Sequence, residues 1–227
     1  MTYTPMQQRL GLIETIHKRT TRDYLGERVI GMNKADCAKV AKRFDFEYWD
    51  GDRKYGYGGY YYDGRWKELA DSLAVFYGLK SHHRVLDVGC GKGYLLYDLS
   101  QAVNGLEVRG VDLSDYALEH AKEEVKASLV RGNAVKLPFA DGEFDLVISI
   151  NTLHNLTLPS LEASLREIER VSKNKKYIVL DSYATEEQKV NLLYWQLTCE
   201  CFYTPDEWGW IFEKCGYKGD YDFIFYD

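Results

Sequence analysis

The segment from Arg84 to Leu99, RVLDVGCGKGYLLYDL, constrains the fold of this chain more than any other part of it. Its first residues, Val85 to Val88, are the short apolar run of a buried parallel strand. Leucines recur at helical spacing after the glycines. Glycines between a strand and a helix allow a tight turn with positive φ and let a ligand lie against bare backbone at the helix start. This order of strand, loop and helix predicts a nucleotide-type cofactor site in an α/β fold.

The spacing of the glycine loop indicates the kind of cofactor. Asp87, Gly89, Gly91 and Gly93 form a D-x-G-x-G-x-G pattern, whereas nicotinamide enzymes favour G-x-G-x-x-G. A phosphate-binding G-x-x-x-x-G-K-[ST] loop is excluded because Lys92 is followed by glycine. The pattern resembles motif I of the class I S-adenosylmethionine-dependent methyltransferases. Taken alone, it also fits a glycine-rich turn in another α/β protein.

The resemblance continues in the next two strands and extends over residues 84–183. Asp112 ends the strand EVRGVDL nineteen positions after Gly93, close to where a Rossmann fold places the carboxylate that accepts ribose hydroxyls. Asn133 and Ala134 match the family's pair along the adenine edge, and Phe144 to Ile150 read as the fourth strand. The resemblance implies S-adenosylmethionine as cofactor. The candidate cofactor-binding residues are Asp87, Gly89, Gly91, Gly93, Asp112, Leu113, Asn133, Ala134 and Ile150.

These patterns predict a Rossmann-like three-layer α/β sandwich with a mostly parallel sheet. We expect residues 1–64 to form a helical and Tyr/Gly-rich lid, and residues 65–227 to form the cofactor-binding domain with a lid insertion at about 184–203. Apolar spacing over residues 6–13 predicts a first helix, and Asn33 is the expected N-cap of a second. The family normally ends in an antiparallel pair of strands, but the chain after Gly216 is long enough for only one good strand.

The aromatic run from Phe46 to Trp66 is the expected place of substrate specificity. Tyrosines, among them Tyr57 and Tyr60, alternate there with glycines, a composition suited to closing over a ligand. The alternative is that these rings only pack the loop onto the helices beneath it.

Positive charge is concentrated near the start of an acidic protein. Residues 17–43 hold eight lysines and arginines against three acidic residues, a local excess of five, although the whole chain carries a net charge of -6. These cations either form solvated helix faces or line the entrance for an anionic substrate. The head resembles methyltransferases of bacterial cell-surface polysaccharide biosynthesis, including a branch associated with capsular O-methyl phosphoramidate. That resemblance implies a sugar hydroxyl or a phosphoramidate oxygen as acceptor, with Arg19, Arg22 and Arg53 as candidate contacts.

The chain after the fourth strand reads SINTLHNLTLP and lacks the N/D-P-P-Y signature of methyltransferases that act on planar amino groups. It also lacks the Pro-Cys pair of the cytosine-ring enzymes. Asn151 is a candidate substrate contact. His154 is the candidate base, because many small-molecule methyltransferases place a polar residue there and imidazole accepts a proton near neutral pH. A structural histidine that caps the next helix is the competing interpretation. We expect methyl transfer to an oxygen or nitrogen of a small molecule.

Composition limits the kinds of binding partner and the cellular compartment that we expect. The negative net charge argues against nucleic acid as the main partner, and the absence of a long apolar run argues against a membrane span and a signal peptide. We therefore expect a cytoplasmic protein whose oligomeric state is open. The irregular spacing of the five cysteines predicts reduced thiols. The spacing of Cys199, Cys201 and Cys215 is poorly suited to binding zinc, so we expect no metal. A nicotinamide-dependent oxidoreductase and a non-catalytic cofactor-binding protein remain as rival functions.

Overall fold

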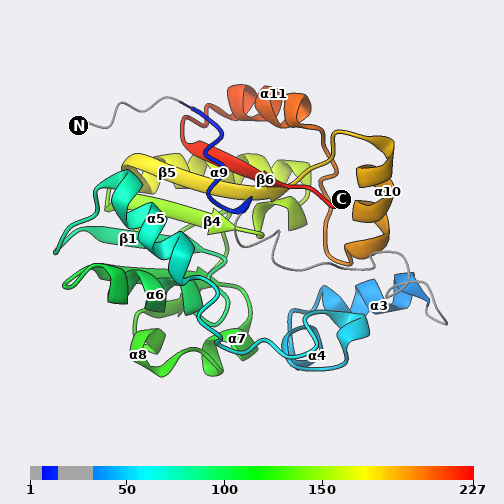
Figure 1. The fold of residues 1–227 in the computed structure, drawn as a ribbon, viewed down its shortest axis with the longest axis horizontal. Coiled ribbons are helices and arrows are strands. Elements are labelled where there is room, and N and C mark those ends of the chain that lie inside the picture. The colour runs from blue at the N-terminus through cyan, green and yellow to red at the C-terminus, as the bar shows by residue number, and fades with distance from the viewer. Residues whose placement is uncertain (1–6, 15–32) are drawn as a thin grey trace.

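The computed structural model describes residues 7–14 and 33–227. Within these residues the strands form one sheet in the order β3-β2-β1-β4-β5-β6, and every pairing is parallel. The strands are β1 (Arg84–Val88), β2 (Glu107–Asp112), β3 (Leu129–Arg131), β4 (Phe144–Ile150), β5 (Ser172–Asp181) and β6 (Asp220–Ile224). Helices cover both faces of the sheet (Figure 1), so the prediction of a Rossmann-like three-layer α/β sandwich is confirmed.

Side chains that alternate between the two faces of the sheet divide the hydrophobic core into two layers. The longer helices are α5 (Lys67–Tyr77), α6 (Tyr94–Ala102), α9 (Leu158–Val171), α10 (Glu186–Trp195) and α11 (Pro205–Cys215). Val85 of β1 packs in the layer of α5, α6 and α10, whereas its neighbour Leu86 packs in the layer of α9 and α11. Successive side chains of a strand point to opposite faces, so a strand buried on both sides needs apolar residues at consecutive positions. This explains the apolar run in β1.

The shorter helical segments surround the carboxyl ends of the strands. They are α3 (Lys34–Ala41), α4 (Phe46–Trp49), η1 (Arg53–Tyr55), α7 (Asp115–Glu119), α8 (Glu123–Lys126) and η2 (Leu153–Asn155). The predicted N-cap Asn33 is confirmed, because its side chain accepts hydrogen bonds from the N–H groups of Ala35 and Asp36.

The chain around Leu10, which lies beside the outer edge of β6, differs from the sequence prediction. Leu10 donates its N–H to the carbonyl of Tyr221 at 3.1 Å, and Tyr221 donates to the carbonyl of Gln8 at 3.0 Å. Leu10 therefore lies in extended chain, and the helix predicted over residues 6–13 is wrong at this position; residue 6 lies outside the described residues. The buried carboxylate of Asp222 accepts the N–H of Leu10 at 3.0 Å. The apolar spacing could not indicate that the β6 edge offers these hydrogen bonds.

The head of the chain packs against the 184–203 segment (Figure 1, α3 and α10). Cys37 and Ala41 of α3 share an apolar cluster with Leu197. Lys42 forms an ion pair with Glu200 across the same contact. The two segments predicted to form a lid therefore touch each other, while the division into residues 1–64 and 65–227 stays a prediction. In the described part of the chain, no helix has the length and apolarity needed to cross a membrane.

Candidate functional site

A cleft lies beyond the carboxyl ends of β1, β2 and β4. The strand order reverses between β1 and β4, and open α/β sheets bind ligands at such a point. All the predicted cofactor-binding residues line this cleft except Gly93, and so do the predicted substrate contacts Tyr57, Tyr60 and Asn151.

Two of the loop glycines are required by their close neighbours. Gly89 has φ of +83°, and a Cβ there would lie 2.1 Å from Oγ1 of Thr152. Gly91 has φ of +53°, and a Cβ there would lie 2.8 Å from the ring of Trp49. Gly93, at φ of +72°, is the N-cap of α6 and faces side chains of the protein core rather than the cleft. Its predicted cofactor contact is therefore replaced by a structural role at the helix start.

The cleft holds two carboxyl groups, Asp112 and Asp87, which differ in the hydrogen bonds that they accept. The oxygens of Asp112 accept the N–H groups of Gly91 at 2.7 Å and Ser114 at 2.8 Å, which fixes the carboxylate against the glycine loop. Asp87 is buried, and its Oδ1 has no hydrogen-bond partner in the described structure. Burial and then the charge of Asp112 raise the pKa of Asp87 to about 8. This half of the cleft therefore favours a cationic ligand that can donate hydrogen bonds.

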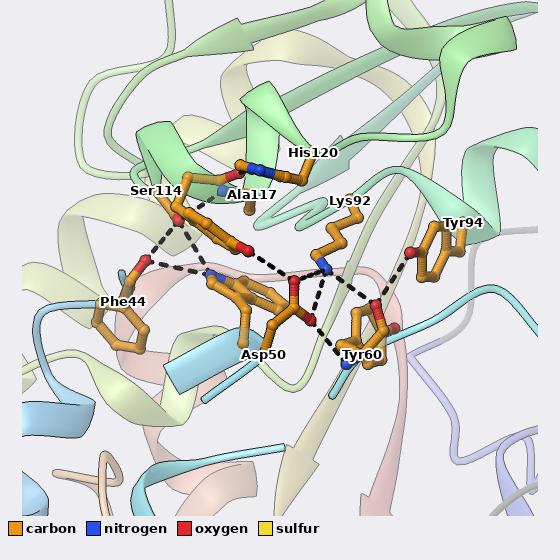
Figure 2. A network of polar contacts seen from close by, with 10 residues as sticks. Phe44, Asp50, Tyr60, Lys92, Tyr94, Ser114, Ala117 and His120 are labelled. Carbon is orange, nitrogen blue, oxygen red and sulfur yellow. Dashed lines mark hydrogen bonds and ion pairs between the residues drawn. The ribbon is translucent and has the colours of Figure 1, made fainter. Parts of the chain in front are cut away.

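A partly buried ion pair joins the head to the glycine loop (Figure 2). Lys92 Nζ donates to both carboxylate oxygens of Asp50, at 2.8 and 2.6 Å, and to the carbonyl of Tyr60 at 3.0 Å. The phenol of Tyr116 donates to Asp50 Oδ2 at 2.8 Å. Burial raises the pKa of Asp50, but the bonds from Lys92 and the Tyr60 N–H outweigh it and hold the pKa below its usual range. The Asp50 carboxyl is therefore ionised at neutral pH.

Trp49 makes a further contact between the head of the chain and the rest of the cleft. Its Nε1 donates to Oγ of Ser114 at 3.0 Å and to the carbonyl of Phe44 at 3.2 Å (Figure 2). Its ring stacks on Tyr57 with centroids 5.4 Å apart, and Tyr57 packs on Tyr60 at 4.5 Å. The aromatic head therefore forms one wall of the cleft. Sequence reasoning identified the aromatic run as a candidate lid but did not single out Trp49.

The predicted cationic contacts are not in the cleft. Arg53 is exposed; it donates to the carbonyl of Gly56 at 2.6 Å, and its guanidinium lies 4.9 Å from the ring centroid of Trp195. It does not line the cleft, so the expectation that it contacts the substrate there is not met. Arg19 and Arg22 lie outside the described residues.

His154 does not face the cleft, and its interpretation as the base is wrong for this geometry. The side chain is 2 % exposed, and its Nδ1 accepts the N–H of Asp181 at 3.1 Å. The proton of the neutral ring is therefore on Nε2, which lies 3.4 Å from Asp181 Oδ2. Burial lowers the pKa of His154, with the Asp181 charge opposing it, so the ring is neutral. Its one lone pair, on Nδ1, is occupied by the Asp181 N–H and is not available for a substrate. This is the structural histidine of the competing interpretation, although it packs in the core rather than capping a helix.

Known proteins match the central part of this chain. Residues 85–175 match the family model described as a methyltransferase domain. A 2-phytyl-1,4-naphtoquinone methyltransferase of Trichormus variabilis is 32% identical over 168 residues, which cover 70% of this chain and 69% of that protein. A demethylmenaquinone methyltransferase of Staphylococcus saprophyticus is 42% identical over 106 residues, which cover 44% of this chain and 45% of that protein.

Solved structures share the fold. A putative methyltransferase from Bacillus halodurans C-125 superposes with a TM-score of 0.54 at 23% identity and covers 65% of this chain and 68% of its own. The YcgJ protein of Bacillus subtilis gives a TM-score of 0.51 at 22% identity, covering 64% of this chain and 67% of its own. At these identities the likeness shows the fold alone.

Proposed function

The chain belongs to the class I S-adenosylmethionine-dependent methyltransferases, and we propose that it methylates a hydroxyl oxygen of a neutral ring compound. The observation that carries this proposal is the composition of the aromatic wall of the cleft, which is distinct from the acidic half that holds Asp87 and Asp112. No lysine, arginine or histidine is among the described residues that line the cleft. Aromatic rings offer flat apolar contact to a ring compound, and neutral polar groups orient its hydroxyls. The aromatic lining residues are Phe44, Tyr48, Trp49, Tyr57, Tyr60, Trp66 and Tyr94.

The residues of the acidic half fit the cofactor. Asp87 has a buried oxygen without a partner, which suits the ammonium of the methionine part. Asp112 is held in place by two backbone N–H groups and keeps lone pairs for the ribose hydroxyls. In our assignment Leu113, Asn133 and Ala134 lie along the adenine. The bound cofactor supplies a methyl group already activated on a sulfonium sulfur.

The protein mainly aligns the acceptor oxygen with the methyl group, and water is the proton acceptor. As the O–C bond forms, the C–S bond breaks, the hydroxyl proton passes to solvent water, and S-adenosylhomocysteine is left as the neutral product. Alignment of a bound nucleophile with the bond that breaks accounts for a large part of such rate enhancements. The ion pair of Asp50 with Lys92 supports this role, because it holds the aromatic wall over the glycine loop.

Two kinds of ring compound are candidates for the acceptor. The names of the two related enzymes support a ring related to naphthoquinone, while the resemblance of the head to enzymes of surface polysaccharide biosynthesis supports a sugar hydroxyl. A phosphoramidate oxygen carries negative charge and would need a cation, for which Arg19 and Arg22 are the remaining candidates.

The test is release of S-adenosylhomocysteine by the full chain from S-adenosylmethionine. The acceptor panel holds 1,4-dihydroxynaphthalene, nucleotide sugars with free hydroxyls, and a sugar phosphoramidate, with mass spectrometry of each product. We expect a product heavier by one methyl group with a neutral hydroxyl compound. Turnover of the phosphoramidate alone would contradict the proposal and point to residues 15–32 as the source of the cation. Cofactor binding without turnover of any acceptor would favour a non-catalytic protein.

A further inference from the structure

The residue that follows β4 has an unusual backbone conformation. Asn151 has φ of +55°, a left-handed value that is rare outside glycine and is several-fold more common for asparagine and aspartate than for other residues. Its N–H donates to the carbonyl of Val179 at 3.1 Å, and its carbonyl accepts Nδ2 of Asn155 at 3.2 Å. Such conformations persist where the surroundings enforce them, and they concentrate at functional sites. The backbone of this cleft-lining residue is therefore held in one position.

The side chain of Asn151 presents a hydrogen-bond donor to the cleft. Its Oδ1 is shielded from solvent, whereas its Nδ2 is not shielded and bonds to none of the described residues. The accessible end of the amide is thus the nitrogen, which donates up to two hydrogen bonds and accepts none. The partner that this nitrogen lacks must therefore carry lone pairs.

The sheet places Asn151 on the side of the cleft where Asp87 lies. β4 runs beside β1, and Ile148 of β4 is paired with Asp87. After Asn151, the side chain of Thr152 packs against the glycine loop. Asp112 ends β2, which lies on the opposite side of β1 from β4. With the ribose at Asp112 and the ammonium at Asp87, Asn151 lies at the methionine part of the cofactor rather than at its adenosine part.

The methionine part of the cofactor has a second charged group that is still without a partner. Its carboxylate is attached to the same carbon atom as the ammonium, so it lies next to the group that we place at Asp87. A carboxylate that leaves water needs a cation or hydrogen-bond donors. Among the cleft-lining residues that the structure describes there is no lysine, arginine or histidine. The accessible amide nitrogen of Asn151 is a neutral donor on the required side of the cleft.

We propose that Asn151 Nδ2 donates a hydrogen bond to the carboxylate of the cofactor, so that Asp87 and Asn151 recognise the two charged groups of its amino-acid part. This inference rests on the proposed placement of the ammonium at Asp87 and is independent of the identity of the methyl acceptor. A neutral donor suits this position, because a lysine or arginine beside Asp87 would pair with that carboxylate and compete with the ammonium.

The experiment measures the binding of two probes to the full chain by calorimetry. S-adenosylhomocysteine carries both charged groups, and its decarboxylated counterpart, S-adenosyl-3-thiopropylamine, keeps the amine and lacks the carboxylate. We expect the wild type to bind S-adenosylhomocysteine about tenfold more tightly than the counterpart. Asn151→Asp keeps the size and the left-handed backbone but replaces the donor by a negative charge. It should weaken S-adenosylhomocysteine about tenfold or more without weakening the counterpart, so that the preference is lost or reversed.

Two further variants separate this contact from general effects of charge and folding. Asn151→Gly removes the donor without adding charge and keeps the left-handed backbone, so it should reduce the preference without reversing it. Asn133→Asp is the matched control, because it adds the same charge to the cleft at the adenine and can still accept the N–H of Val135. It should change both affinities by the same factor. Binding of the decarboxylated probe reports that the cleft of each variant is folded.

Three results would overturn the inference. They are a wild type that does not prefer S-adenosylhomocysteine, a preference that persists in both Asn151 variants, and a loss of affinity in those variants that is confined to the methyl acceptor. Failure of the ammonium placement is seen separately, because Asp87→Asn would then leave the affinity for both amine-carrying probes unchanged. Failure of the proposed methylation is seen as absence of S-adenosylhomocysteine release from any hydroxyl compound.

Discussion

Replacing Asp87 by asparagine removes the charge that we assign to the cofactor ammonium while keeping the size of the side chain. The pKa of Asp87 is raised to about 8, so most of the cofactor-free protein carries a proton there at pH 7. Binding of an ammonium group beside the carboxylate requires that proton to leave. Cofactor binding to the wild type at pH 7 should therefore release most of one proton, and binding to Asp87→Asn should release none from this site.

The same substitution should have opposite effects on affinity and stability. Loss of a charge-assisted hydrogen bond should weaken cofactor binding by about 1.5–3 kcal/mol, or roughly 10- to 150-fold. Because the carboxyl pKa is raised by folding, its contribution to stability is complete below about pH 4 and is lost as pH rises through about 8. At pH 8 the ionised group costs the cofactor-free protein at most about 5 kcal/mol. Asp87→Asn should therefore melt at a higher temperature than the wild type at pH 8 and at a similar temperature near pH 4.

Calorimetry in two buffers of different ionisation enthalpy measures the released protons, and thermal melts across pH measure the stability. Asp98→Asn is the matched control, because Asp98 is also buried with a pKa raised first by burial, but it bonds to Tyr62 outside the cleft. It should leave cofactor affinity and proton release unchanged. Equal proton release by the wild type and Asp87→Asn would refute the assignment of Asp87 to the ammonium.

Three other predictions test the rest of the site. Asp112→Ala should weaken cofactor binding by a few kcal/mol in calorimetry, since hydrogen bonds to the ribose are lost, and unchanged binding would contradict the cofactor placement. Lys92→Met leaves the partly buried carboxylate of Asp50 without its cation and should destabilise the protein by about 1–3 kcal/mol in denaturant melts; Lys92→Met combined with Asp50→Asn should recover part of this loss, and additive losses would show that the two side chains are not coupled. Because burial lowers the pKa of His154, stability should fall as pH drops below the ordinary histidine pKa of 6.5, and His154→Gln should reduce this dependence without moving the pH profile of turnover, whereas a profile that loses its fall at low pH would restore the base interpretation.

The cofactor half of the site could be predicted from the sequence because its determinants are local. The strand β1, the glycine spacing and Asp112 lie within 29 residues, from position 84 to position 112, and the parallel sheet fixes where they meet. The ion pair of Asp50 with Lys92 could not be predicted in this way. Its partners are 42 positions apart in a chain with 29 basic and 35 acidic residues, and no local pattern selects that pair.

The segment after β4 shows a second reason why part of the site could not be predicted from the sequence. Asn151, His154 and Asn155 are all polar residues at a position where the family faces its substrate, and sequence alone cannot rank them. The left-handed turn at Asn151 and the short 3-10 helix η2 decide the outcome, because each residue of a 3-10 helix turns the side-chain direction by about 120°. His154 is thereby turned into the core, whereas Asn155 lines the cleft.

Asp87 places an unsatisfied buried carboxylate oxygen in the cleft, and its titration gives cofactor binding a pH response. This oxygen lowers the stability of the free protein until a donor reaches it, so the cofactor should raise the melting temperature. Asp87 must lose a proton to receive the cofactor, so stabilisation by the cofactor should increase as pH rises toward about 8. Stabilisation by a neutral acceptor added to the cofactor complex should not follow this dependence, because the cofactor already occupies Asp87. A common pH dependence for both ligands would mean that Asp87 also governs acceptor binding.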